Sequence, residues 1–181
     1  MKFNNKIIFG AYIYLIIWFS GCDGSEKTQF ALFFKSDIDN LIGWIDHPSF
    51  MRTDDAYSSM YVCRLNGDLK KTYPFNLPNN QVKCGSSNIV EIKVAGMIYF
   101  QDQDGNCSLV AEIKEGEKVI KVYEKQFTKD EIKTKNWTNV ELIIPIKQDE
   151  YNKDEFKLST YFRQNGSSEI YIDDFIVHYR D

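Results

Sequence analysis

The sequence predicts an all-β protein, an antiparallel β-sandwich or barrel, on three observations. From residue 30 onward, apolar side chains recur mostly at every second position, which is the period of a half-buried strand. Turn-forming residues separate the apolar runs, most clearly Asp-Gly-Asn at residues 104–106 and Asn-Gly-Ser at residues 165–167. Helical periodicity is nearly absent, since only residues 128–135 are suited to a single helical turn. Eight or nine strands in one unrepeated domain imply antiparallel pairing.

The predicted strands follow one another between these turns. Each is rich in aliphatic, aromatic and β-branched residues and ends near Gly, Pro, Asn, Asp or Ser, and in order they are residues 58–66, 71–77, 89–101, 108–114, 119–127, 140–146, 156–163 and 169–180. Alternation is clear at residues 108–114, where Ser108, Glu112 and Lys114 share the face opposite the apolar one. Such a strand is expected to cover a core on one side and to meet water on the other.

Length, charge and histidine content exclude several classes of protein. With 181 residues, 43% of them hydrophobic, the chain is long enough for one domain with a single buried core and additional segments. Acidic side chains outnumber basic ones by 26 to 22, which argues against the basic face that a nucleic-acid-binding protein needs. His47 and His178 are the two histidines of the sequence, too few for a three-histidine metal site.

The first residues predict an export signal with a lipid attachment site. Lys2 and Lys6 precede an apolar run at residues 7–19, whose length as a helix, about 20 Å, is short of the roughly 30 Å hydrocarbon core of a bilayer. Ser and Gly follow, and then Cys22. This stretch resembles a bacterial lipoprotein signal, in which the cysteine is lipidated and becomes the first mature residue, with Phe19 in place of the usual leucine. The alternative is ordinary secretory cleavage beside an incidental cysteine.

This leader sets the expected domain organisation and localisation. Residues 1–21 are expected to be the signal peptide, residues 22–29 a lipidated tether, and residues 30–181 the β-sandwich domain. The acyl chains would hold the protein on a membrane of the bacterial cell envelope, at the outer membrane or the cell surface.

Three cysteines remain beyond the leader: Cys63, Cys84 and Cys107. An odd number leaves at least one thiol unpaired, and no C-x-x-C pair indicates a zinc or redox site. Cys63 lies inside a predicted strand and is expected to pack as a small hydrophobe rather than to act as a nucleophile. If a disulfide forms, the pair Cys63 and Cys84 is weakly preferred.

Three short motifs stand in a defined order along the domain. Residues 36–44 contain Ser-Asp-Ile-Asp followed by Gly-Trp, and residues 55–61 contain a small-residue turn before a strand, with Ser59 at a position that is usually glycine. The third motif begins at Trp137, which is expected to cover the core, and ends with Ile-Tyr-Ile-Asp-Asp-Phe at residues 170–175. Together they resemble the galactose-binding-like superfamily, which includes many carbohydrate-binding modules. The resemblance implies an antiparallel jelly-roll β-sandwich.

Two adjacent carboxylates interrupt the closing strand. Asp173 and Asp174 follow each other there, so one of them points into the core unless a bulge turns it outward. A buried carboxylate needs a cation, a basic side chain or backbone donors. The resemblance implies a structural Ca²⁺ held by an acid from the first strand and one from the last, here Asp39 with Asp173 or Asp174. The alternative is that these acids cap turn amides or pair with lysine.

Ligand-binding residues are expected where aromatic and hydrogen-bonding side chains share an outward sheet face. Tyr161 and Arg163 alternate with apolar residues and therefore face outward together. An aromatic ring that stacks on a pyranose beside polar groups is the sugar site that the resemblance implies. Tyr99, Phe100 and Trp44 are further candidates for exposed aromatic residues. The alternative is that these rings serve only core or cross-strand packing.

No motif in the sequence indicates catalysis. A G-x-S-x-G elbow, a glycine-rich phosphate loop and an H-E-x-x-H sequence are all absent. We therefore expect a lipid-anchored, non-catalytic binding module for carbohydrate, with a membrane as its partner through the lipid and no nucleic acid. The alternative is a structural module that binds another cell-envelope protein and no glycan. A small glycosidase or lyase is a third and less favoured hypothesis.

Overall fold

The computed structural model describes residues 31–36, 48–58, 60–72, 74–78, 89–147, 149 and 155–180. The predicted signal peptide and tether, with Cys22, lie outside these residues, and so do Asp39, Trp44, His47, Ser59 and Cys84. Within the described part of the chain, no helix is long and apolar enough to cross a bilayer.

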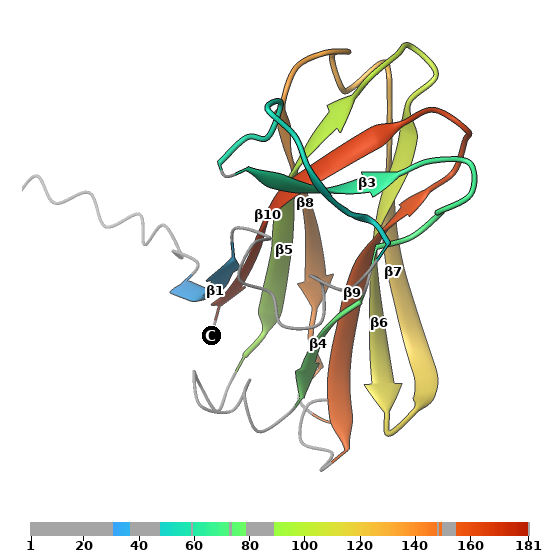
Figure 1. Ribbon diagram of the computed structural model, residues 1–181. Coiled ribbons are helices and arrows are strands. Elements are labelled where there is room, and N and C mark those ends of the chain that lie inside the picture. Colours follow the sequence, from blue (N-terminus) through green and yellow to red (C-terminus); the bar gives the residue numbers. More distant parts are fainter. Residues whose placement is uncertain are drawn as a thin grey trace, which may run out of the picture.

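Two antiparallel sheets face each other (Figure 1). The larger has the order β2-β3-β10-β5-β8, with β1 also paired to β10, and consists of β1 (Ala31–Ser36), β2 (Phe50–Arg52), β3 (Tyr61–Leu65), β5 (Glu91–Phe100), β8 (Thr138–Pro145) and β10 (Ile170–Arg180). The four-stranded sheet has the order β4-β9-β6-β7 and consists of β4 (Phe75–Pro78), β9 (Phe156–Gln164), β6 (Asn106–Glu115) and β7 (Lys118–Thr128). The predicted all-β antiparallel sandwich is confirmed.

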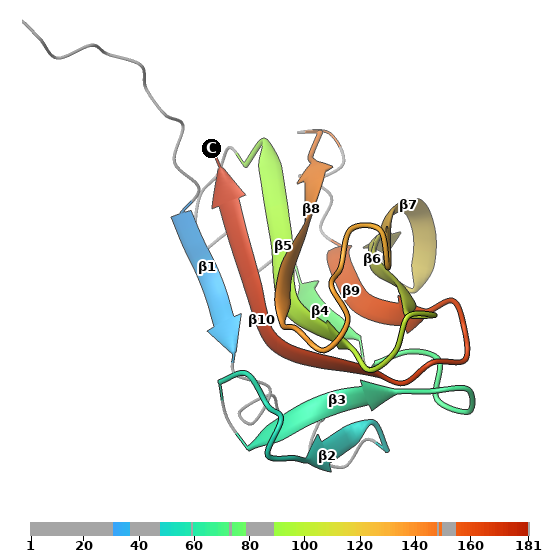
Figure 2. The same ribbon diagram turned by 90° about the horizontal axis from the view of Figure 1, so that it is seen from above.

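Strand β10 joins the parts of the larger sheet. It pairs with β5 along one edge, and on the other edge it pairs first with β3 and then with β1 (Figure 2). The closing run of the sequence is therefore flanked on both sides. Its first six residues, Ile170 to Phe175, are all buried, so burial does not alternate in this part of the strand.

The core lies between the two sheets and is filled by the inward positions of their strands. Phe162 of β9 and Phe175 of β10 meet across it, with their ring centroids 6.5 Å apart. Phe100 is fully buried in the same core, so its assignment as an exposed aromatic was wrong. The reason is alternation: Phe100 pairs with Ile170 on the inward face, whereas its neighbour Tyr99 pairs with Tyr171 on the outward face.

Two cysteines belong to this core. Cys63 and Cys107 are both fully buried free thiols, which confirms that Cys63 packs as a small hydrophobe and does not support its pairing with Cys84. Burial raises the pKa of the Cys107 thiol to about 12 and also raises the pKa of the Cys63 thiol. Neither group is a thiolate at neutral pH, so neither is a nucleophile.

Candidate functional site

The outward face of the four-stranded sheet gathers polar side chains from three neighbouring strands. This polar face consists of Asn106, Ser108, Glu112 and Lys114 of β6, Glu124 and Gln126 of β7, and Tyr161 and Arg163 of β9. Strand β6 lies between the other two, so residues distant in sequence meet across it. Ser108, for example, pairs with Arg163 on one side and with Gln126 on the other.

Tyr161 is partly buried on this face and is held by a neighbouring carboxylate. Its Oη donates a hydrogen bond to Oε1 of Glu112 at 2.9 Å, and Oε2 of Glu112 lies 3.0 Å from Nζ of Lys114. Burial, reinforced by the hydrogen bond to Glu112, raises the pKa of Tyr161 to about 12. The phenol is therefore protonated at neutral pH, and its direction is fixed.

Arg163 is anchored in a similar way by Glu124 of β7. Nη2 of Arg163 lies 2.5 Å from Oε1 of Glu124, so the pair bridges across β6. A hydrogen bond from Ser108, and then the contact with Arg163, hold the pKa of Glu124 below its usual value. Both charged side chains are more than a third exposed, so this ion pair orients groups more than it stabilises the fold.

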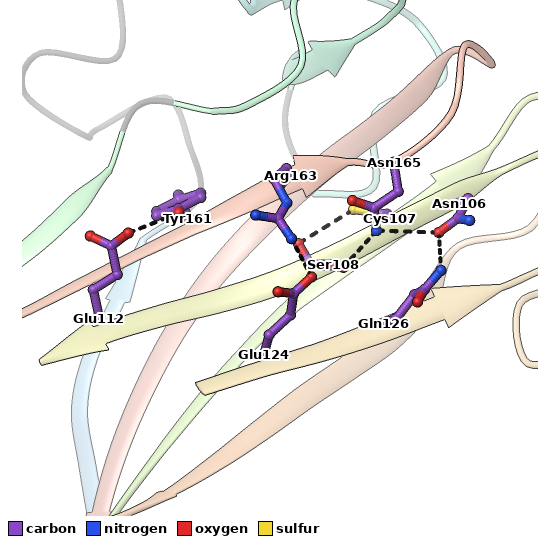
Figure 3. Close-up of polar contacts among 9 residues, drawn as sticks. All are labelled: Asn106, Cys107, Ser108, Glu112, Glu124, Gln126, Tyr161, Arg163 and Asn165. Carbon is purple, nitrogen blue, oxygen red and sulfur yellow. Dashed lines mark hydrogen bonds and ion pairs between the residues drawn. The ribbon is translucent and has the colours of Figure 1, made fainter. Parts of the chain in front are cut away.

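Amide side chains extend the polar face past the end of β9 (Figure 3). Nδ2 of Asn165 donates to Oγ of Ser108 at 2.6 Å and lies 3.3 Å from Oδ1 of Asn106. The same oxygen accepts a hydrogen bond from Nε2 of Gln126 at 2.8 Å. Amide, hydroxyl, guanidinium and carboxylate groups thus stand close together, able to donate and to accept hydrogen bonds.

A pocket of about 90 Å³ opens beside Tyr161. Sheet residues and the segment before β4 line it together: Glu112, Lys114, Ser159 and Tyr161 from the sheet, with Lys71, Thr72 and Pro74 from that segment. Lys71 is brought there by a backbone bridge to Arg163, and its Nζ stands 5.9 Å from the centroid of the Tyr161 ring. The pocket therefore combines an aromatic ring, two ammonium groups and one carboxylate.

A row of aromatic side chains lies on the outward face of the other sheet. Trp137 packs between Tyr57 and Tyr99, with ring centroids 6.0 Å and 5.4 Å away, and Tyr171 follows 5.9 Å from Tyr99. Nε1 of Trp137 donates to the backbone oxygen of Asp55 at 2.8 Å, which attaches the loop before β3 to the sheet. The expectation that Trp137 covers the core was therefore wrong, because its indole packs beside the outward-facing Tyr99.

The predicted ligand-binding residues do not all come together. Tyr161 and Arg163 share the polar face, as alternation predicted. Tyr99 stands on the opposite sheet, in the aromatic row. The two sheets are packed about 10 Å apart with the core between them, and the two surfaces face away from each other. A single sugar unit cannot contact both, so the sequence named residues of two separate surfaces.

The acid pair lies at a bulge in β10. The register with β5 shifts between Asp173 and Phe175, and Asp174 takes the left-handed backbone conformation, with φ of 44°. A Cβ at Gly96 of β5 would come within 2.9 Å of the Asp174 carbonyl oxygen, so glycine permits this close approach. The bulge brings both carboxylates to Ser58, whose Oγ donates to Oδ1 of Asp174 at 2.7 Å.

Asp173 caps the amides of the loop before β3. Its Oδ2 accepts hydrogen bonds from the backbone N–H groups of Tyr57 and Ser58, at 2.9 Å and 3.1 Å. Burial raises the pKa of Asp173 in spite of these donors, and the charge of Asp174 adds to the rise. Capping of turn amides was one of the alternatives to calcium. Among the described residues, no three His, Cys, Asp or Glu side chains form a group that could hold a metal ion.

Sequence reasoning missed several members of the polar face. The sequence predicted that Glu112 and Lys114 are polar members of an alternating strand. It did not predict that they are neighbours of Tyr161, because the spacing of residues along one strand does not determine which strand pairs with it. Apart from their polarity, nothing in the sequence indicated that Lys71 and Asn165 belong to the polar face, since Lys71 lies in a loop and Asn165 lies just after the end of a strand. The register of β6 against β9 is what assembles them.

The comparisons with known proteins bear on the fold. No protein-family model matches the sequence, and no curated protein matches it. Among solved structures, the chain is similar to the CBM22-1 xylan-binding domain of Paenibacillus barcinonensis Xyn10C, with 11% identity, a TM-score of 0.53, and coverage of 84% of this chain and 96% of that one. The CBM22-2 domain of the same protein gives 11% identity and a TM-score of 0.55, covering 81% of this chain and 99% of that one.

A third similar structure is the xylan-binding module CBM15, with 13% identity and a TM-score of 0.55, covering 81% of this chain and 95% of that one. Identities this low show the fold alone. The predicted jelly-roll β-sandwich is confirmed, and the structural neighbours are carbohydrate-binding modules.

Proposed function

We propose that this protein is a carbohydrate-binding module whose ligand lies on the polar face. The observation that carries the proposal is the partly buried ring of Tyr161, held by Glu112 and bordered by Arg163 and a pocket. The fold is shared with modules whose names record xylan binding, which supports a glycan as the ligand class.

The mechanism is ring stacking combined with hydrogen bonding on a rigid sheet. The apolar C–H face of a pyranose packs on the Tyr161 ring, while neighbouring hydroxyls bond to Arg163, Glu124, Asn165 and Gln126. These groups are already oriented by one another, so little conformational entropy is lost on binding. Side chains that both donate and accept suit the hydroxyl groups of a neutral or charged sugar.

The proposed role is non-catalytic. A glycosidase needs one carboxylic acid with a raised pKa, which protonates the leaving group, and a second carboxylate opposite it. On the polar face, Ser108 and Arg163 lower the pKa of Glu124, and Glu112 is engaged by Tyr161 and Lys114. These carboxylates are placed to bind and to orient their neighbours.

We further propose that the module is attached to a membrane of the bacterial cell envelope by acyl chains on Cys22. The support is the charged start, the short apolar run and the small residues that precede this cysteine. Lipid attachment would keep a captured glycan close to the membrane, where several acyl chains on one residue anchor more durably than one.

Calcium at the acid pair stays a proposal that depends on Asp39. Asp173 and Asp174 are both buried and share Ser58, and hard carboxylate oxygens are what Ca²⁺ prefers. Two amides already occupy one oxygen of Asp173, so a bound ion would use the remaining oxygens of the pair. Its role would be structural, neutralising two adjacent negative charges.

A glycan array tests the proposed function. The full chain is purified in a detergent without a sugar headgroup, and binding is confirmed by calorimetry on the best oligosaccharide. Specific binding to a family of related glycans is the expected result. A folded protein that binds no glycan would overturn the proposal and turn attention to a protein partner in the cell envelope.

A further inference from the structure

The pocket beside Tyr161 holds more positive than negative charge. Glu112 is its single lining carboxylate, and this group is already engaged by Lys114 at 3.0 Å and by the Tyr161 phenol at 2.9 Å. Lys71 is exposed, and in the part of the chain that the structure describes its ammonium contacts the Tyr161 ring without a carboxylate partner. One cation at the mouth of the pocket is therefore left for a ligand.

A buried hydroxyl in the same pocket also lacks a partner. Ser159 lines the pocket and is 1% exposed, and its Oγ makes no hydrogen bond within the described structure. Native proteins rarely leave a buried hydroxyl unsatisfied, because such a group costs about 1–3 kcal/mol. A polar group that enters the pocket would give the Ser159 hydroxyl a partner.

The size of the pocket limits what can enter. Its volume is about 90 Å³. A cavity that holds benzene measures roughly 150 Å³. A six-membered sugar ring therefore stays outside, over Tyr161, and a substituent of a few atoms enters. The charge of Lys71 selects, among such substituents, a carboxylate over a hydroxymethyl group.

We propose that this pocket receives the carboxylate of an acidic sugar, so that the module prefers glycans that contain uronic acid. The inference rests on the proposed function and specifies its ligand class. Lys71 supplies the ion pair, Lys114 offsets the charge of Glu112, and Ser159 donates a hydrogen bond from the floor of the pocket. The sugar ring that carries the carboxylate lies against Tyr161.

The test compares one oligosaccharide in two forms. A uronic-acid oligosaccharide and its carboxyl-reduced counterpart, in which each carboxylate has become a hydroxymethyl group, are titrated against the full chain by calorimetry. The acidic form is expected to bind about tenfold more tightly at low salt. High salt should reduce this ratio, because the contact is partly exposed.

Two variants test whether Lys71 is the residue that causes the preference for the acidic form. Lys71→Gln should lower the affinity for the acidic form to that for the reduced form, so that the difference between the two forms disappears. Lys70→Gln, which removes an exposed lysine that does not line the pocket, is the matched control and should keep the full preference. Equal loss in both variants would show a general charge effect and overturn the inference.

The outcomes separate the two proposals. If both forms bind with the same affinity, the acidic preference is overturned while carbohydrate binding stands. If neither form binds and the array is also blank, the proposed function fails as well. A preference that survives Lys71→Gln would overturn the assignment of this pocket.

Discussion

The phenol of Tyr161 donates a hydrogen bond to the carboxylate of Glu112 on the neighbouring strand, at 2.9 Å. This contact joins β9 to β6 on the polar face and fixes the orientation of an aromatic ring beside a pocket. It also connects the proposed site to measurable quantities: a ligand affinity and a tyrosine pKa.

Replacing Tyr161 by Ala should weaken glycan binding by about 30-fold, or about 2 kcal/mol, because a central aromatic contact is lost. Calorimetry on the best array ligand measures this change. Tyr57→Ala is the matched control, since Tyr57 is 53% exposed and belongs to the aromatic row of the other sheet. Loss of binding in Tyr57→Ala alone would move the site to that row.

Tyr161 should titrate near pH 12, about two units above an ordinary tyrosine. Burial and the Glu112 hydrogen bond favour the neutral phenol in the folded state, so its contribution to stability is complete below pH 10 and is lost as the pH rises towards 12. Nuclear magnetic resonance of ring-labelled tyrosine, compared with Tyr161→Phe, identifies the signal. A signal that titrates near pH 10 would contradict the assigned contact.

Gly96→Ala should destabilise the fold by roughly 1–3 kcal/mol. The added methyl group would come within 2.9 Å of the Asp174 carbonyl oxygen and of Cζ of Phe162. Urea unfolding measures the loss. Gly67→Ala is the control, because nothing lies within 4 Å of its added carbon, and it should leave stability nearly unchanged.

Asp173→Ala should cost about 2 kcal/mol of stability, because two loop amides lose their acceptor. Thermal unfolding measures this, with the exposed Asp54→Ala as the control. The same experiment tests calcium: the wild-type protein should melt higher with calcium than with chelator, and Asp173→Ala should lose that difference. If the wild-type protein melts at the same temperature with calcium and with chelator, the proposed calcium site is contradicted, while the capping of the loop amides by Asp173 is not affected.

Cys22→Ser should abolish lipid attachment completely when the chain is expressed in a bacterial host. The wild-type chain should incorporate labelled fatty acid and enter the detergent phase on phase separation, because acyl chains partition with the detergent. The variant should carry no label. Equal labelling of both chains would show that Cys22 is not the site.

Alternation was a reliable guide wherever one face of a strand meets the core. It placed Tyr161 and Arg163 outward, because burial of the opposite face leaves little freedom in register. It was less useful next to turns. Trp137 precedes β8, and its indole is placed by the loop at Asp55, which no local pattern predicts.

The acid pair, Asp173 and Asp174, also combines a feature that the local sequence predicted with one that only the tertiary structure placed. Two adjacent carboxylates in an apolar strand predicted either a bulge or a buried charge with a partner, and the structure contains both. The partner is a loop more than a hundred residues earlier in the chain, which only the folded sheet brings near.

By itself, the sequence determined the all-β class, the positions of most strands, the outward direction of Tyr161 and the expectation of a lipid anchor. These follow from local periodicity and composition, which act within a few residues. The tertiary structure alone decided that Glu112, Glu124 and Lys71 surround Tyr161 and Arg163, and that Tyr99 lies on the other sheet. The reason is that strand order and register are set by the packing of the whole core, so contacts across strands cannot be derived from spacing along one.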